Sequence, residues 1–117
     1  MSNLPSFKNV AVVGMHFRGE HAKKFAAELQ PGDELFLERE PDNPYDQNAI
    51  KVMVFENGNY WHLGYINRTD AAWISPYLEN PSITPKVEVE RVAPAGTGKN
   101  TNLYPFVTIT LEEAEVA

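Results

Sequence analysis

Cysteine is absent from the 117-residue sequence, which excludes disulfide bonds and thiolate chemistry together. Basic residues are scarce as well, because 10 Lys and Arg face 16 Asp and Glu and give a formal net charge of −6 at pH 7. This balance opposes nonspecific binding to nucleic acid, since counterion release requires several cations that face phosphates. It leaves room for a local basic site.

Long apolar runs are also absent, and none approaches the ~18 residues needed to span a membrane. Residues 1–6 lack the basic and then apolar pattern of a secretory signal. We therefore expect a soluble protein with no membrane segment, located in the cytoplasm. With 43% hydrophobic and 22% charged residues, the composition is that of an ordinary globular protein. The length predicts one domain over residues 1–117, with a core at about 7–111 and an acidic, solvated tail from Glu112 onward.

Alternation of apolar and polar residues between turn-forming residues predicts six strands. They cover residues 7–13, 35–40, 49–55, 60–66, 87–92 and 106–111. Two further stretches have the apolar spacing of short helices, at residues 20–29 and 70–78. We expect Asn67 or Thr69 to cap the second helix, and Pro76 to kink or shorten it.

Short strands with turn signals and few helices are typical of small barrels. We therefore expect a mainly β fold with two short helices, arranged as a small six-stranded OB/SH3-like barrel. Trp61 and Trp73 are both assigned mainly to the core. In this assignment Trp73 shares the apolar face of the second helix with Ile74 and Leu78.

Candidates for catalysis or metal binding are few. His16, His21 and His62 lie on different predicted elements and show no spacing that aims two imidazoles at one metal. The acidic loop at residues 42–46 lacks the alternating oxygen ligands and the central glycine of a calcium loop. Neither set of residues predicts a metal site.

A pattern of metal-dependent nucleases is only partly present. In that pattern a Pro-Asp pair is followed by an acid two residues before a lysine, and these groups complete a magnesium site. Pro41-Asp42 and Lys51 fit, but Ala49 occupies the place of the acid. The sequence therefore predicts a protein that is not an enzyme, with no catalytic residue and no cofactor. A small metal-dependent nuclease is kept as an alternative.

The most informative segment joins the second and third predicted strands, at residues 39–52. Pro41 and Pro44 fix the backbone angle φ at two points. The segment also holds three side chains of the kind that bond backbone N–H groups in turns, namely Asn43, Asp46 and Asn48. We expect a loop of definite conformation from which Tyr45 projects.

This segment resembles the signature of the HIRAN domain, a small DNA-binding module found in front of Snf-type helicase-like proteins and, in bacteria and phages, in short stand-alone chains. Two further motifs agree with it, Val-Gly-Met-His-Phe-Arg at residues 13–18 and Leu-Gly-Tyr-Ile at residues 63–66. The resemblance runs from about Val10 to Val107 with the motifs in the right order. It implies a single HIRAN-like domain with a modified OB fold.

Aromatic and basic residues gather around these motifs, as a site for single-stranded nucleic acid requires. Aromatic rings stack on bases, while cations lie along the phosphate backbone. The candidates are the aromatic residues Phe17, Tyr45 and Tyr65 and the donors His16, Arg18, Lys51 and Arg68. We expect the four donors to surround one basic concavity. The alternative roles are core packing for the rings, which suits Tyr45 least, and solvated surface charge for Lys51 and Arg68.

The resemblance implies a sharper site, in which the domain grips the 3′ end of a single strand. The residues carried over are His16, Phe17 and Arg18, then Tyr45 and Asp46, then Arg68. Asp46 is then expected to accept a hydrogen bond from the terminal 3′ hydroxyl. Where the helicase-linked domains tend to place Arg before two aromatic residues, this chain has His, Phe and Arg, which exchanges one stacking surface for charge.

These observations predict a non-catalytic module that binds single-stranded DNA or its 3′ ends in replication or repair. The expected partners are single-stranded DNA and DNA ends, and a separate helicase or nuclease is a further candidate. The second alternative is a protein-interaction module without DNA binding, which the acidic balance favours.

Overall fold

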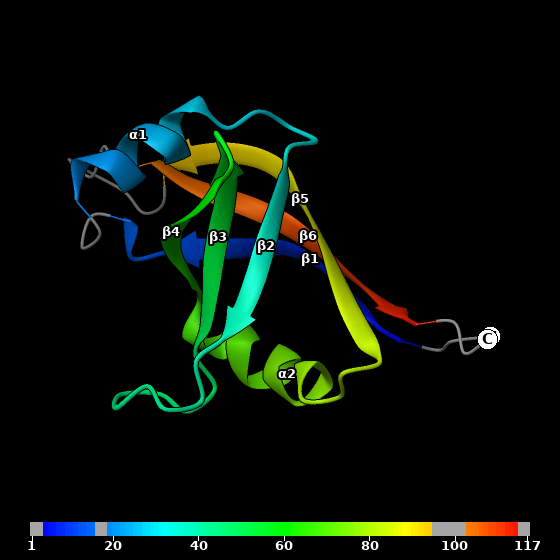
Figure 1. Ribbon diagram of the computed structural model, residues 1–117. Coiled ribbons are helices and arrows are strands. Elements are labelled where there is room, and N and C mark those ends of the chain that lie inside the picture. The colour runs from blue at the N-terminus through cyan, green and yellow to red at the C-terminus, as the bar shows by residue number, and fades with distance from the viewer. Residues whose placement is uncertain (1–3, 16–18, 95–102, 115–117) are drawn as a thin grey trace.

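Six antiparallel strands close into a barrel, and two helices lie against it (Figure 1). The computed structural model describes residues 4–15, 19–94 and 103–114. The strands are β1 (Ser6–Val13), β2 (Glu34–Arg39), β3 (Ile50–Glu56), β4 (Asn59–Ile66), β5 (Ile83–Pro94) and β6 (Leu103–Glu113), and the helices are α1 (Glu20–Glu28) and α2 (Arg68–Leu78). The order around the barrel is β1-β4-β3-β2-β5-β6, and β1 closes it by pairing with β6.

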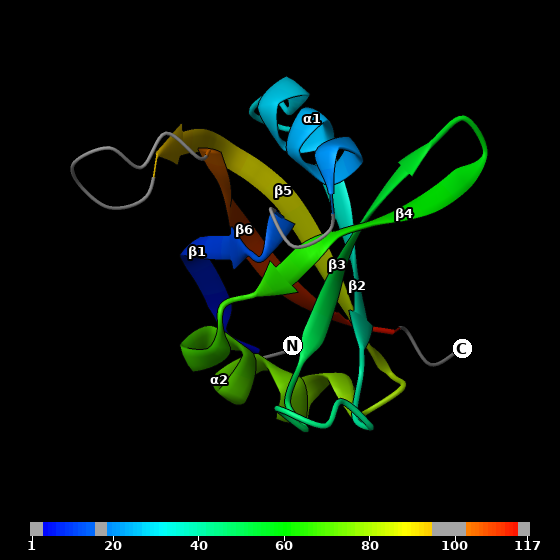
Figure 2. The ribbon, with the colours of Figure 1, turned by 90° about the vertical axis from the view of Figure 1, so that its left-hand side faces the viewer.

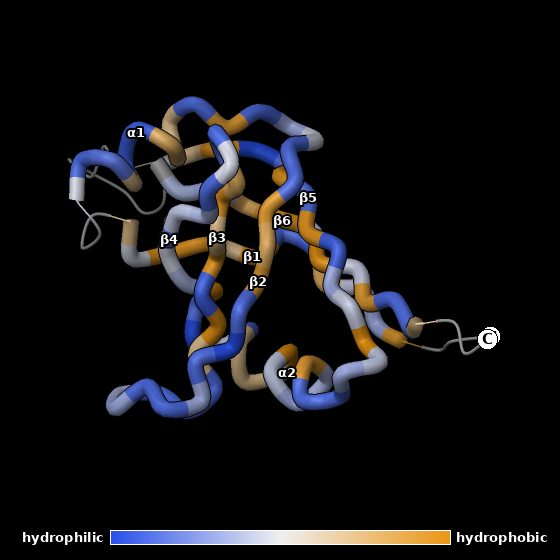
Figure 3. The backbone as a smooth tube through the Cα atoms, in the orientation of Figure 1, coloured by the Kyte–Doolittle hydropathy of each residue, from blue (hydrophilic) through white to orange (hydrophobic). Residues whose placement is uncertain are grey.

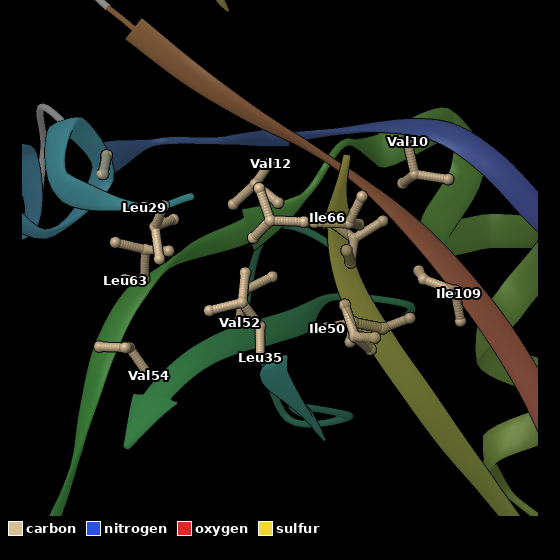
Figure 4. Close-up of a cluster of buried hydrophobic side chains, with 14 of the residues drawn as sticks. Val10, Val12, Leu29, Leu35, Ile50, Val52, Val54, Leu63, Ile66 and Ile109 are labelled. Atoms are coloured by element: carbon tan, nitrogen blue, oxygen red, sulfur yellow. The ribbon is translucent and has the colours of Figure 1, made fainter. Parts of the chain in front are cut away.

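Alternate residues of the strands fill the interior of the barrel. In β3 the side chains of Ile50, Val52 and Val54 are buried, and the residues between them are more exposed. Leu35 of β2 and Ile109 of β6 belong to the same buried cluster (Figure 4). A period of two thus sets which face of each strand enters the core. The predicted mainly β fold with two helices and a six-stranded barrel is confirmed.

Strand β5 is longer than the alternation predicted, because it begins at Ile83 rather than at Val87. Pro85 lies within it, opposite Leu111 of β6. Pairing of β5 with β2 occurs further along, at Val87 and Glu88. A proline is tolerated on a stretch of strand that pairs on one side, since its missing N–H costs no bond there.

The acidic residues near the C-terminus also depart from expectation. Glu112 and Glu113, which were predicted to begin a solvated tail, belong to β6 and pair with Thr84 and Ile83. Their side chains are exposed. Backbone pairing with β5 therefore orders a segment whose charges still face water.

The core assignment of Trp73 was wrong, because this side chain is 70% exposed. Helix α2 instead buries Ala71, Ile74 and Ser75. Trp61, on β4, is 39% exposed and so is only partly buried. Ala71 and Ile74 belong to the buried core, and Trp73 lies on another side of the helix.

Helix α2 is anchored through Asn67, one of its two predicted caps. The Asn67 Oδ1 accepts a hydrogen bond from the Asp70 N–H at 3.1 Å, and its Nδ2 donates to the Ala11 carbonyl of β1 at 3.1 Å. The helix passes through Pro76 and still reaches Leu78. It lies at one end of the barrel beside the β2–β3 loop (Figure 1). Neither helix in the described part of the chain has the length and apolar character to cross a membrane.

Candidate nucleic-acid interface

The loop between β2 and β3, residues 40–49, leaves the barrel as a largely hydrophilic segment (Figure 3). Its base is closed by a hydrogen bond from the Glu40 N–H to the Ala49 carbonyl at 2.9 Å. Two turns follow inside it, with the Asn43 N–H bonded to the Glu40 carbonyl and the Ala49 N–H to the Asp46 carbonyl, each at 3.0 Å. The backbone of the loop is therefore tied to itself at several points.

Asn43 fixes the tip of this loop. Its Oδ1 accepts hydrogen bonds from the N–H groups of Tyr45 at 2.8 Å and Asp46 at 3.1 Å. Its Nδ2 donates to Glu40 Oε1 at 2.6 Å. One amide side chain thus satisfies two backbone donors and links the tip to the base, which gives the loop the definite conformation expected from its composition.

Tyr45 stands on this platform with 88% of its surface exposed. A ring held outward gains no core packing, so a role for Tyr45 in the core is excluded. A tyrosine also loses little conformational entropy on binding, because it has two side-chain torsions and its backbone is already ordered. The geometry suits a flat surface that stacks on another ring.

A shallow hollow of about 390 Å³ lies beside Tyr45, lined by residues 43–48 and by Arg68. Arg68 is the first residue of α2 and is exposed. Among the described residues, no Asp or Glu forms an ion pair with it. The hollow therefore combines an aromatic face with a cation that none of those acids pairs directly, and the Asp46 carboxylate lines the same hollow.

Asp46 lines the same hollow and also has a structural role. Its Oδ1 accepts a hydrogen bond from the Asn48 N–H at 2.9 Å, which caps the second turn of the loop. A carboxylate has two oxygens and about four acceptor positions. The cap therefore occupies only part of its acceptor capacity.

Lys51 lines a different, neighbouring hollow of about 350 Å³. Its Nζ lies 3.2 Å from Glu40 Oε2, and both side chains are less than one third exposed. The carboxylates of Glu38 and Asp42 line this hollow as well, with Arg39 as the second cation. Three acids against two bases do not make a basic surface, so the structure does not bring Lys51 and Arg68 into one basic concavity.

Tyr65 supports the loop from β4. Its hydroxyl donates to Glu40 Oε1 at 3.1 Å, and its ring meets the ring of His62 edge-on, with centroids 4.8 Å apart. The side chain is partly buried. Unlike Tyr45, it is bonded to the loop, and it acts on the loop through Glu40.

Glu40 is the group that sequence reasoning missed. It accepts from Asn43, Lys51 and Tyr65, so it joins the loop to β3 and β4. The hydrogen bond from Asn43, with those from Lys51 and Tyr65, holds the pKa of Glu40 below its ordinary value of 4.5, although partial burial acts in the opposite direction. The same contact with Glu40 raises the pKa of Lys51. A glutamate at the end of a strand with alternating charges carries no signal in the sequence that would mark this role.

Because its pKa is lowered on folding, Glu40 stabilises the folded state fully above its unfolded pKa, and this contribution is lost as the pH falls through the folded pKa. We expect Glu40→Gln to reduce the free energy of unfolding by about 1 kcal/mol at pH 7. The difference from the parent protein should shrink below pH 4.5. Urea unfolding at pH 7 and pH 3 measures it. Glu38→Gln on the same strand is the control, and a pH-dependent difference of equal size in that variant would contradict the assignment to Glu40.

The remaining predicted site residues are His16, Phe17 and Arg18, which lie outside the described residues. Of the other five, Tyr45, Asp46 and Arg68 meet at one hollow. Lys51 lines the neighbouring hollow, and Tyr65 bonds to Glu40. In the part of the chain that the structure describes, His, Asp and Glu side chains form no group of three or more that could hold a metal ion.

A small antiparallel barrel that carries a stiff polar loop with one outward aromatic ring defines the class of small β-barrel binding domains. Comparison with known proteins gives the family, because the model of the HIRAN domain matches residues 7–112. The chain therefore belongs to the HIRAN domain family. Membership supports a DNA-binding module at the level of the family.

Individual relatives agree with this assignment. The chain is 38% identical over 72 residues to the helicase-like transcription factor of Mus musculus, which covers 62% of this chain and 6% of that protein. The crystal structure of a protein from Lactobacillus plantarum has a TM-score of 0.70 at 22% identity and covers 92% of this chain and 95% of that one. The crystal structure of the HIRAN domain of human HLTF has a TM-score of 0.63 at 23% identity. The match covers 94% of this chain and 77% of that one. The two structures show a shared fold.

Proposed function

We propose that this protein is a non-catalytic module that binds single-stranded DNA through its 3′ end, in replication or repair. The observation that carries the proposal is Tyr45, a ring that is 88% exposed on a loop held by its own hydrogen bonds. Stacking of a base on such a ring contributes about 1–3 kcal/mol. Arg68 supplies a cation at the same hollow for the adjoining phosphate.

The net charge of −6 is compatible with this mode of binding, because stacking rather than counterion release provides most of the affinity. The hollow around Glu40 is lined by more acids than bases and does not suit a phosphate backbone. Its glutamate also pairs with Lys51. Affinity should therefore depend only weakly on salt, with a slope of about −0.7 for each phosphate contact.

Asp46 accounts for recognition of the end. One carboxylate oxygen caps the turn at Asn48, and the other accepts the hydrogen bond of a terminal 3′ hydroxyl. An internal nucleotide has no such donor, and a 3′ phosphate is repelled by the carboxylate. The resemblance to the family implies that His16, Phe17 and Arg18 complete the site. The module acts in the cytoplasm, with a separate helicase or nuclease as the enzyme that processes the bound end.

Titration of one short strand with either a 3′ hydroxyl or a 3′ phosphate tests the proposal. The parent protein should prefer the hydroxyl by about 10- to 100-fold, as expected for a hydrogen bond to a charged group. Asp46→Asn keeps an oxygen for the Asn48 N–H but loses the charge, so the preference should fall below about threefold with the loop intact. Fluorescence anisotropy measures both affinities.

Asp42→Asn is the matched control, because it removes the same charge from the same loop outside the hollow lined by Arg68. It should leave the end preference unchanged. If Asp46→Asn keeps the full preference, Asp46 only caps the turn, and the role proposed for it in recognising the end is wrong. Absence of any binding to single strands would instead select the protein-interaction alternative.

A further inference from the structure

A third hollow, of about 330 Å³, lies at the other end of the barrel, between α1 and the β3–β4 hairpin. Figure 2 shows this hairpin extending away from the barrel beside α1, opposite the end that holds the β2–β3 loop. The apolar side chains that line the hollow are Phe25 and Leu29 from the α1 segment and Val54 and Phe55 from β3. Phe55 is 50% exposed, so part of this apolar surface is open to solvent.

Further aromatic rings pack against the rings of Phe25 and Phe55. The Phe55 ring lies 4.8 Å from that of Tyr60, which is 58% exposed. On the α1 side, the Trp61 ring stacks on that of His21 at 5.1 Å and is 39% exposed. Single exposed apolar residues are ordinary, but exposed rings that pack against two lining residues of one hollow, Phe25 and Phe55, mark an interaction surface.

The charges around this hollow are all of one sign. The charged residues that line it are Glu28, Asp33, Glu34 and Glu56. In the described residues none of the four forms an ion pair, and no lysine or arginine lines the hollow. Such a rim repels a phosphate backbone and attracts a cationic partner.

We propose that this end of the barrel binds a segment of another protein in which apolar side chains are flanked by arginine or lysine. The apolar side chains enter the hollow between Phe25 and Phe55, and the flanking cations meet the acidic rim. Arginine suits the exposed rings as well, because its guanidinium packs on aromatic faces. A second copy of this chain would bring a second acidic rim, so charge disfavours self-association here. The proposal is independent of the DNA site at the opposite end.

Two fluorescein-labelled peptides test this surface on the full chain. The first is Arg-Arg-Leu-Leu-Arg-Arg, and the second has serine in place of both leucines and the same charge. We expect the leucine peptide to bind at least tenfold more tightly by anisotropy at physiological ionic strength. Equal binding of the two peptides would overturn the proposal, because it would show attraction by charge alone.

Charge reversal then locates the binding surface. The double substitution Glu28→Lys and Glu56→Lys should weaken binding of the leucine peptide at least tenfold. It should not weaken binding of single-stranded DNA. The control, Glu112→Lys with Glu113→Lys, makes the same change in charge on the exposed end of β6 and should alter peptide binding less than twofold. Equal losses in both pairs would overturn the proposal. So would a concentration-dependent dimer, measured by sedimentation, that Phe55→Ser dissociates, since that result would make this face a contact between copies.

Discussion

Replacing Tyr45 by alanine is expected to weaken binding to every single strand by about 5- to 150-fold, which corresponds to about 1–3 kcal/mol of base stacking. The loss should not depend on whether the 3′ end is free, because the ring contributes affinity and Asp46 contributes discrimination. The melting temperature should stay unchanged, since a side chain that is 88% exposed contributes almost nothing to the core. Anisotropy titrations alongside thermal melting measure both properties.

Two control variants isolate the stacking surface. Tyr45→Phe keeps the ring and should bind within about twofold of the parent protein, because the stacking face is unchanged. Tyr60→Ala removes an exposed tyrosine from the opposite end of the barrel and should leave DNA binding unchanged. If Tyr45→Ala binds normally, or if Tyr60→Ala loses as much affinity, the β2–β3 loop is not the stacking platform.

The barrel was predictable from the sequence because strand burial has a period of two. Ile50, Val52 and Val54 point inward wherever the partner strands lie, so the alternation alone assigns their faces. The order of the loop was predictable for a similar reason. Asn43 and Asp46 bond N–H groups within five residues, and such local bonds need no information about the rest of the fold.

Features that depend on distant parts of the chain were not predictable in this way. Trp73 is exposed because Ala71 and Ile74 face the barrel, and a helix with apolar residues on several sides does not reveal which side is covered. Ser75 is buried with its hydroxyl satisfied, because the Arg39 Nε–H donates to it across 36 positions of sequence. The ion pair between Lys51 and Glu40 likewise needs the closed base of the loop, which places their side chains together. The pair with Glu40 also holds Lys51 in the neighbouring hollow, away from the hollow that Arg68 lines, so these two predicted donors do not share one basic concavity.

The motif residue Gly64 supports the site through packing, which leads to the second large expected effect. A Cβ at this position would lie 2.5 Å from the Val13 carbonyl oxygen of β1 and 3.0 Å from Met15 Sδ. Since a backbone oxygen cannot move without breaking the pairing of β1 with β4, Gly64→Ala should lower the free energy of unfolding by about 1–3 kcal/mol or more. The pairing places Val13 opposite Tyr65, so the support of the loop by Tyr65 should weaken too.

Urea unfolding measures this effect as a fall in the midpoint with an unchanged dependence on denaturant. Gly58→Ala separates crowding from backbone strain, because Gly58 has a φ of 80° and open space around its Cβ position. That variant should lose only about 1 kcal/mol, the usual cost of a left-handed conformation in a residue with a side chain. Gly64 does not have a positive φ, so its larger loss must come from the close approach of β1. Equal losses in the two variants would contradict this explanation, and a Gly64→Ala protein of normal stability would show that β1 can move away without cost.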